Sequence, residues 1–274
     1  MTKYETIEFE RAGSVGWLRL DRPEKLNSFT VAMWHEMRAL GEEVQNDPDL
    51  RAVVVIGKGR AFSSGIDTTL FTGGSSDAIQ TGDDAGTRHA DPTVDGILRA
   101  QAAYSWLADA RYPTIAAVHG YALGAGLQLA LACDVRVFAR GAQVGLLEHK
   151  YGILPDLGGT QRLPRVVGAS KAKEMIWTAA RIDADESYRI GLCDRLVDEA
   201  DLESEVTALA ATIAAQPPLA VQGAKRAVEA ASRLPVTEGL VVEAEEQRVC
   251  LASDDMREAI TAFVEQRIPE YKGR

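Results

Sequence analysis

The sequence is poor in cysteine and has no excess of positive charge. Its three cysteines, Cys133, Cys193 and Cys250, lie far apart, and none belongs to a C-x-x-C pair. This spacing argues against a disulfide scaffold and against a zinc site, and it is typical of a reducing compartment. The formal net charge of −10 argues against nucleic acid and anionic membrane surfaces as main partners. An anionic small ligand remains compatible with a few well-placed basic side chains.

Nothing in the sequence suggests an export signal, an uninterrupted membrane span or a familiar nucleotide-binding loop. Its first residues, MTKYETIEFERAG, are charged and have no apolar core, so we expect a cytoplasmic protein. The apolar run 113–134 is interrupted by Pro113, His119 and Gln128 and by glycines, which excludes a membrane helix there. The glycine spacing in that run, G-x-x-x-G-x-G, matches neither G-x-G-x-x-G nor the P-loop pattern.

What the sequence does contain is one stretch, 113–134, around which we expect the rest to be organised. It predicts a buried strand over 114–118, a glycine-rich turn over 120–126 and a helix from about residue 127. Glycines in such a turn let the backbone bend and let a ligand approach closely. The N–H groups at a helix start have no intrahelical partner, and they favour negative charge that develops during a reaction. We interpret the turn as a site for a carbonyl oxygen that becomes an oxyanion; a turn that only packs is the alternative.

The remaining pattern divides the chain into an α/β core, residues 1–198, and a helical region, residues 199–274. With 274 residues and 46% hydrophobic content, the chain can form one large domain with a helical appendage. The periodicity predicts strands at 6–10, 15–20, 53–57, 114–118, 135–139 and 142–145. It predicts helices at 30–45, 97–110, 166–180, 184–190, 202–215, 218–231, 236–251 and 253–266. Residues 72–95 are rich in Gly, Ser, Asp and Thr, which predicts a mobile excursion that is either a disordered insertion or a lid.

Six motifs, in order along the chain, resemble one known family. They are LDRPEKLNSF at 20–29, AFSSGIDTTLF at 61–71, AAVHGYALGAGLQLALACDVRVF at 116–138, EHKYGILPDLGGTQRLPRVVG at 148–168, GLCDRLV at 191–197 and PPLAVQGAKRAV at 217–228. The chain resembles the crotonase superfamily, also called the enoyl-CoA hydratase/isomerase family. The resemblance implies a spiral of ββα units with a C-terminal helical region that packs trimers, usually doubled to hexamers. It also implies acyl-CoA thioester substrates in fatty acid metabolism, with no cofactor beyond the CoA of the substrate and no metal.

The resemblance places an oxyanion hole on two main-chain N–H groups, those of Ile66 and Ala125. Alanine stands at 125 where many relatives have glycine, and it still supplies an N–H unless its backbone is strongly left-handed. Around these donors the resemblance implies substrate contacts at Ser64, Gly65, Asp67, Gly124 and Gly126, although Asp67 could instead cap the next helix. It implies basic partners for the CoA phosphates at Lys25, Arg60 or Lys272.

Candidate acid/base groups lie in the fourth motif and in the central helix. From spacing alone, Glu148 could be an ordinary helix-start residue and Asp156 a cap. The resemblance puts Glu148 at the position of the catalytic glutamate of hydratases and several isomerases, and Asp156 at that of an aspartate in dienoyl-CoA isomerases. Gln128 replaces the second glutamate of hydratases, and an amide cannot exchange a proton at neutral pH. Apolar neighbours, Leu146, Leu147, Ile153 and Leu154, should raise the pKa of a carboxyl there by desolvation.

The histidines are weaker candidates. His119 precedes Gly120 at a strand end, where we expect a packed or hydrogen-bonded side chain, and neither His89 nor His149 has a recognisable metal partner.

The function that we expect first is that of an enzyme that shifts the double bond of an enoyl-CoA. In this reaction Glu148, alone or with Asp156, moves the proton. An alternative is hydration of 2-enoyl-CoA, with Glu148 alone handling the proton. A third possibility, motivated by Gln128, is an acyl-CoA-binding protein that has no catalytic activity.

Overall fold

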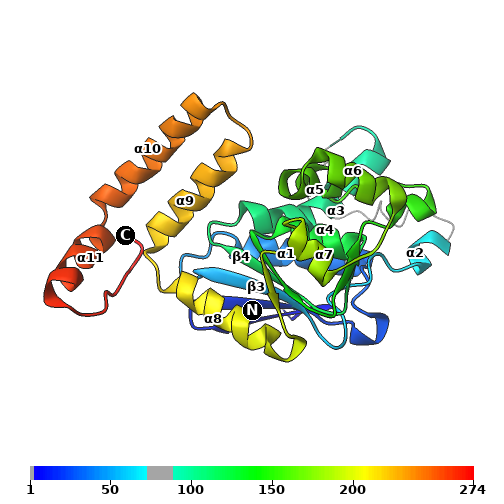
Figure 1. The fold of residues 1–274 in the computed structure, drawn as a ribbon, viewed down its shortest axis with the longest axis horizontal. Coiled ribbons are helices and arrows are strands. Elements are labelled where there is room, and N and C mark those ends of the chain that lie inside the picture. Colours follow the sequence, from blue (N-terminus) through cyan, green and yellow to red (C-terminus); the bar gives the residue numbers. More distant parts are fainter. Residues whose placement is uncertain (1–2, 73–88) are drawn as a thin grey trace.

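Two β-sheets form the framework of the computed structural model, which describes residues 3–72 and 89–274 (Figure 1). The larger sheet has the order β1-β2-β3-β4-β6-β9, and the smaller has the order β5-β7-β8. In the larger sheet β1 and β2 form an antiparallel hairpin and all other pairs are parallel. The strands of the larger sheet are β1 (Ile7–Ala12), β2 (Val15–Leu20), β3 (Ala52–Gly57), β4 (Thr114–Val118), β6 (Val135–Ala139) and β9 (Arg195–Val197). Those of the smaller sheet are β5 (Tyr121–Leu123), β7 (Gln143–Gly145) and β8 (Ile182–Asp183).

The central strands are apolar along their whole length because both faces of the larger sheet are covered. Every residue of β3 and of β4 is buried, as expected for parallel strands between two layers. Helices α1 (Val31–Val44), α3 (Pro92–Asp109) and α4 (Ala125–Ala132) contribute to the larger core on one face. Helix α8 (Leu202–Ala214) covers the other face with Leu202, Val206 and Ala210. The sheet is therefore a rigid base from which the loops that follow its strands project.

The central stretch holds one more strand than we expected. The predicted strand at 114–118 is confirmed as β4, but the predicted turn contains β5, which pairs with β7. Helix α4 begins at Ala125, two residues before the expected start. The extra strand forms because Ser63, far away in the sequence, also bonds to this segment: its N–H donates to Tyr121 O at 2.8 Å.

Several helix boundaries also differ from the sequence prediction. Helix α3 begins at Pro92 instead of residue 97, because the carboxylate of Asp91 caps it by accepting from the N–H groups of Thr93 and Val94. Residues 92–95 of the expected excursion 72–95 are therefore part of a helix, while its central part, 73–88, lies outside the described residues. The expected helix 166–180 is two helices, α5 (Gly159–Val167) and α6 (Ala169–Thr178), separated by Gly168 at φ +79°.

Other short elements complete the described core. They are α2 (Thr69–Thr72), α7 (Ala184–Arg189), and the 3-10 helices η1 (Pro23–Lys25), η3 (Glu148–Tyr151) and η4 (Glu199–Asp201). The strands β8 and β9 were not predicted, because two or three residues with charged side chains give no readable alternation.

Three C-terminal helices project from the core as an arm (Figure 1). They are α9 (Pro218–Ala231), α10 (Val236–Ala252) and α11 (Asp254–Glu265), and α10 has no buried residue. Lys225 fixes the base of the arm, because its ammonium group donates to Asp134 Oδ2 at 2.8 Å and to Tyr112 O at 3.0 Å. The expected boundary at 198 falls before α8, which packs on the sheet, so the projecting part begins only at Pro218.

Candidate active site

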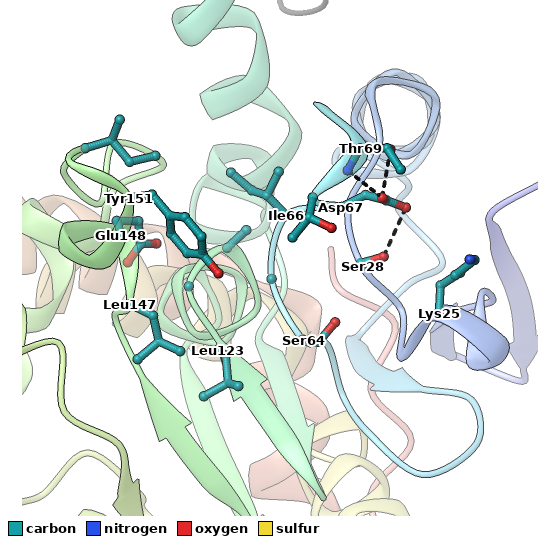
Figure 2. Close-up of a pocket in the computed structure, with 15 residues that line it drawn as sticks. Lys25, Ser28, Ser64, Ile66, Asp67, Thr69, Leu123, Leu147, Glu148 and Tyr151 are labelled. Carbon is teal, nitrogen blue, oxygen red and sulfur yellow. Dashed lines mark hydrogen bonds between the residues drawn. The ribbon is translucent and has the colours of Figure 1, made fainter. Parts of the chain in front are cut away.

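A cavity of about 390 Å³ opens where the loops that follow β2, β3, β5 and β7 meet (Figure 2). Its wall includes residues 64–69, 123–125, 147–148 and the side chains of Tyr151 and Ile153. The carboxyl ends of parallel strands are the usual place for ligand sites in α/β sheets. Two predicted groups of site residues, those around 65 and those around 124, are thus brought together here.

Two glycines allow the loops around 65 and 124 to lie against each other. Gly65 has φ +105°, and a Cβ there would lie 2.9 Å from Leu123 O. Gly124 has φ +51°, and a Cβ there would lie 3.2 Å from the Oε1 atom of Glu148. A side chain at either position would therefore be strained; at Gly65 it would push the two loops apart, and at Gly124 it would press on Glu148.

Ile66 and Ala125 both line this cavity, and their main-chain N–H groups have no hydrogen-bond partner within residues 3–72 and 89–274. By contrast, Asp67 N donates to Phe29 O at 2.9 Å and Gly124 N to Gly145 O at 2.8 Å. A Cβ built on Gly65 would lie 3.9 Å from the nitrogen of Ala125, so the loops that carry the two donors are adjacent. Ala125 is not among the residues with positive φ, so its methyl group is accommodated without backbone strain.

Glu148 places a nearly buried carboxyl in the same cavity wall (Figure 2). The residue begins η3 and is 5% exposed. Its Oε1 accepts a hydrogen bond of 2.7 Å from Gln128 Nε2, whereas Oε2 is buried without a partner in the described part of the chain. Burial raises the pKa of Glu148 from 4.5 to about 7, and the Asp156 charge adds to this, while the bond from Gln128 opposes it. Such a carboxyl can both accept and donate a proton near neutral pH.

The other two predicted acid/base residues do not line the cavity. Gln128 is fully buried in α4, and its Oε1 accepts from Gly159 N at 2.9 Å. Asp156 is half-buried in the loop before α5, and its main-chain oxygen accepts from Gln101 Nε2 at 2.6 Å. Burial raises the pKa of Asp156, and its charge acts on Glu148.

The opposite side of the cavity is polar (Figure 2). Asp67 accepts from Ser28 Oγ at 3.3 Å and from the Arg22 guanidinium at 3.1 Å, and its Oδ1 accepts from Thr69. Burial by itself would raise the pKa of Asp67, but the hydrogen bonds from Thr69 and Arg22 outweigh it and lower the pKa. This carboxylate therefore stays charged and fixed. Lys25 and Ser64 also contribute to the wall, and Lys25 is exposed.

Several predicted residues lie elsewhere. Gly126 packs against the main chain of Ser63, since a Cβ there would lie 2.6 Å from Ser63 O. Arg60 is exposed and does not line the cavity. Lys272 lies near the C-terminus and does not line the cavity. Its N–H donates to Asp255.

The histidines have structural surroundings. His119 Nε2 lies 3.0 Å from Gly59 O, His89 Nδ1 accepts from Asp91 N, and His149 is exposed. Among the described residues, no group of three or more His, Cys, Asp or Glu side chains could hold a metal ion. Within the same residues, every helix is too short or too polar to cross a membrane.

Some wall residues were not singled out from the sequence, namely Ser28, Thr68, Thr69, Leu123 and Tyr151. Of the four apolar neighbours expected around Glu148, Leu147 and Ile153 line the cavity and the other two do not. The readable signal for all five was their place in the quoted motifs, and Leu123 also belongs to the unpredicted strand β5.

Comparisons with known proteins identify the family. A family model described as Enoyl-CoA hydratase/isomerase matches residues 10–274. The chain belongs to the enoyl-CoA hydratase/isomerase family. "Probable enoyl-CoA hydratase echA8" of Mycobacterium bovis is 37% identical over 273 residues, 99% of each chain. "Short-chain-enoyl-CoA hydratase" of Clostridium acetobutylicum is 34% identical over 270 residues, 98% of each chain.

Solved structures show that the fold is that of the enoyl-CoA hydratase/isomerase family. An enoyl-CoA hydratase from Bacillus anthracis has a TM-score of 0.89 at 31% identity, covering 98% of this chain and 100% of that one. A protein from Thermobifida fusca YX, solved in complex with CoA, has a TM-score of 0.80 at 35% identity, covering 90% and 93%. The expected crotonase fold with C-terminal helices is confirmed, and the chain is an enzyme of this family. The named relatives are hydratases, which favours hydration over the double-bond shift that we expected first.

Proposed function

We propose that this enzyme adds water to the double bond of 2-enoyl-CoA thioesters. The observation that carries the proposal is one buried carboxyl, Glu148, in a cavity that also presents the unpartnered N–H groups of Ile66 and Ala125. The choice of hydration follows the relatives, whose printed names are hydratases.

In this proposal the thioester oxygen of the substrate accepts hydrogen bonds from Ile66 N and Ala125 N. When water attacks C3, the electron pair of the C2=C3 bond moves toward the carbonyl, and the developing enolate oxygen is stabilised by the two fixed donors. The loss of one such donor typically costs about 10²–10³ in rate. Ionised Glu148 takes the proton from the attacking water and returns it to C2, so the carboxyl ends the cycle ionised.

The two sides of the cavity suit the two ends of such a substrate. The apolar wall, with Leu123, Leu147 and Ile153, suits the acyl chain. The exposed ammonium group of Lys25 lies across the cavity from Glu148 and suits the CoA phosphates (Figure 2). Binding of CoA by the Thermobifida fusca protein supports this placement of the ligand.

A second candidate, the double-bond shift, is favoured by two observations at the same carboxyl. Gln128 stands where hydratases carry a second glutamate, and the Asp156 charge acts on Glu148. In that reaction Glu148 removes a proton from C2 of a 3-enoyl-CoA and a proton returns at C4, with no oxygen added.

Labelled water separates the two candidates. The purified protein is incubated in H₂¹⁸O with crotonyl-CoA and, separately, with a 3-enoyl-CoA, and the products are analysed by mass spectrometry. We expect ¹⁸O at C3 of a 3-hydroxyacyl product, and a loss of about 10²–10⁴-fold in the Glu148→Gln variant. Conjugation of the 3-enoyl-CoA without ¹⁸O uptake would support the second candidate instead. Tight binding of both thioesters without turnover would contradict both and would point to a binding protein.

We also propose that the enzyme assembles into homotrimers or dimers of trimers through its arm. Large apolar side chains are exposed on α10, α11 and the segment after them, among them Leu240, Leu251, Phe263 and Ile268. Phe263 is 84% exposed, and apolar side chains gathered in this way are typical of an interface.

A further inference from the structure

We propose that Gln128 is a positioning residue that holds the Glu148 carboxyl in one orientation and leaves only its Oε2 atom to exchange protons with the substrate. The inference rests on the proposed function, in which Glu148 carries the proton. It assigns a task to the residue that distinguishes this chain from hydratases with two glutamates.

The side-chain amide of Gln128 is bonded at both ends. Its Oε1 accepts from Gly159 N at 2.9 Å, and its Nε2 donates to Glu148 Oε1 at 2.7 Å. Gly159 is the first residue of α5, and its N–H has no partner within that helix. Because an N–H can only donate, the amide atom that faces Gly159 must be the oxygen, and the NH₂ group must therefore face Glu148. The orientation of Gln128 is thus determined by its surroundings.

The surroundings also leave Gln128 no space for another arrangement. The side chain is fully buried, and a Cβ on Gly159 would lie 2.9 Å from its Oε1. Glu148 is confined as well, since a Cβ on Gly124 would lie 3.2 Å from Glu148 Oε1. Two glycines therefore make room for this one chain of hydrogen bonds, from α5 through Gln128 to Glu148.

The consequence for Glu148 is that its two oxygens are not equivalent. Oε1 is occupied by the amide, whereas Oε2 is buried and has no partner among the described residues. A donor to the carboxylate favours the ionised form, so Gln128 counteracts the effect of burial on the pKa. The other titratable groups coupled to this site are Asp156, whose charge raises the pKa of Glu148, and the buried Tyr104, whose pKa the Glu148 charge helps to raise.

A glutamate at position 128 would behave differently. Two carboxyls at this separation cannot both be ionised, so they would share a proton and titrate in two coupled steps. With Gln128, Glu148 exchanges its proton without that coupling. This chain is therefore built around a single proton-transfer carboxyl.

The test compares Gln128→Met, which keeps the size and removes both hydrogen bonds, with Gln128→Glu. Gln222→Met is the matched control, because Gln222 is a 5% exposed glutamine on α9 that accepts from Arg111, far along the chain from this site. The carboxyl of Glu148 is titrated by infrared difference spectroscopy in the resting protein, with Glu148→Gln used to assign its band. The pH profiles of kcat and KM are then measured on the same variants.

We expect Gln128→Met to raise the titration midpoint of Glu148 by about one to two pH units, the usual effect of losing a hydrogen bond to a charged group. The ionised fraction at pH 7, and kcat with it, would then fall by about 5–50-fold, with a smaller change in KM. Gln128→Glu should show two titration steps, and Gln222→Met should keep the original midpoint.

An unchanged midpoint in Gln128→Met, or a single unshifted step in Gln128→Glu, would overturn the inference and leave Gln128 as a packing residue. Gln128→Glu retains the shape of the side chain, so it also answers the question if Gln128→Met does not fold. Because the infrared titration needs no turnover, a failure of the proposed reaction would not be mistaken for a failure of this inference.

Discussion

At the scale of single residues, the buried carboxyl of Glu148 couples the stability of the fold to pH. Its pKa rises from 4.5 to about 7 on folding, chiefly because of burial. The folded state therefore binds the proton more tightly than the unfolded chain. The resulting stabilisation is fully present below pH 4.5 and is lost as the pH rises through about 7.

We expect Glu148→Gln to remove this dependence, because an amide is neutral throughout. The difference in unfolding free energy between the native protein and the variant should change by about 3 kcal/mol between pH 4.5 and about pH 8, with the variant favoured at high pH. Urea unfolding at the two pH values measures it. A difference that stays constant across this range would mean that Glu148 is ionised normally in the folded protein.

The same residue shows how much of the site could be predicted from sequence. Its motif placed Glu148 correctly beside the loops around 65 and 124, and the apolar neighbours predicted the direction of its pKa shift. The sequence could not show that Gln128 bonds to Glu148 and Gly159, because these residues are 20 and 31 positions away along the chain. Nor could it show that Arg22 holds Asp67, a pair 45 positions apart.

At the scale of elements, long periodic segments were predictable and short paired ones were not. Strand β4 and helix α9 have the bounds expected from their own residues. Strand β5 has three residues and forms only because β7 and Ser63 lie beside it. Helix α5 begins at Gly159, seven residues before the start at 166 that the sequence pattern predicted.

The loop that carries Ile66 depends on Gly65, and a substitution at this glycine offers a way to move the N–H donor of Ile66. In Gly65→Ala the Cβ would lie 2.9 Å from Leu123 O at φ +105°, so the loop must shift and Ile66 N must move with it. Gly13→Ala is the matched control: its φ is +65°, but nothing lies within 4 Å of a Cβ there. Both variants carry backbone strain of about 1–3 kcal/mol, and only the first disturbs the cavity.

At the scale of the whole molecule, contacts within a single chain do not explain why the arm projects from the core. Helix α10 buries no residue, and Phe263 and Ile268 are 84% and 88% exposed. Burial of such side chains between copies of the chain would give the arm a reason to project from the core. The assembly that we expect is the trimer or hexamer implied by the family resemblance.

Light scattering at several protein concentrations measures this assembly. We expect a mass of three or six times the 29.6 kDa chain, and a shift toward smaller species in Phe263→Asp. Thr207→Asp adds the same charge at an exposed position of α8 and should leave the mass unchanged. A 29.6 kDa monomer at every concentration would contradict the proposed assembly.

The most direct test of the central claim is the infrared carbonyl stretch of crotonyl-CoA, labelled with ¹³C at the thioester carbon and bound to Glu148→Gln, which holds it without turnover. If Ile66 N and Ala125 N both donate to that oxygen, the stretch should lie at a lower frequency than in water. Adding Gly65→Ala should reverse much of the shift, and adding Gly13→Ala should not. A saturated complex whose carbonyl absorbs at the frequency found in water would contradict the account.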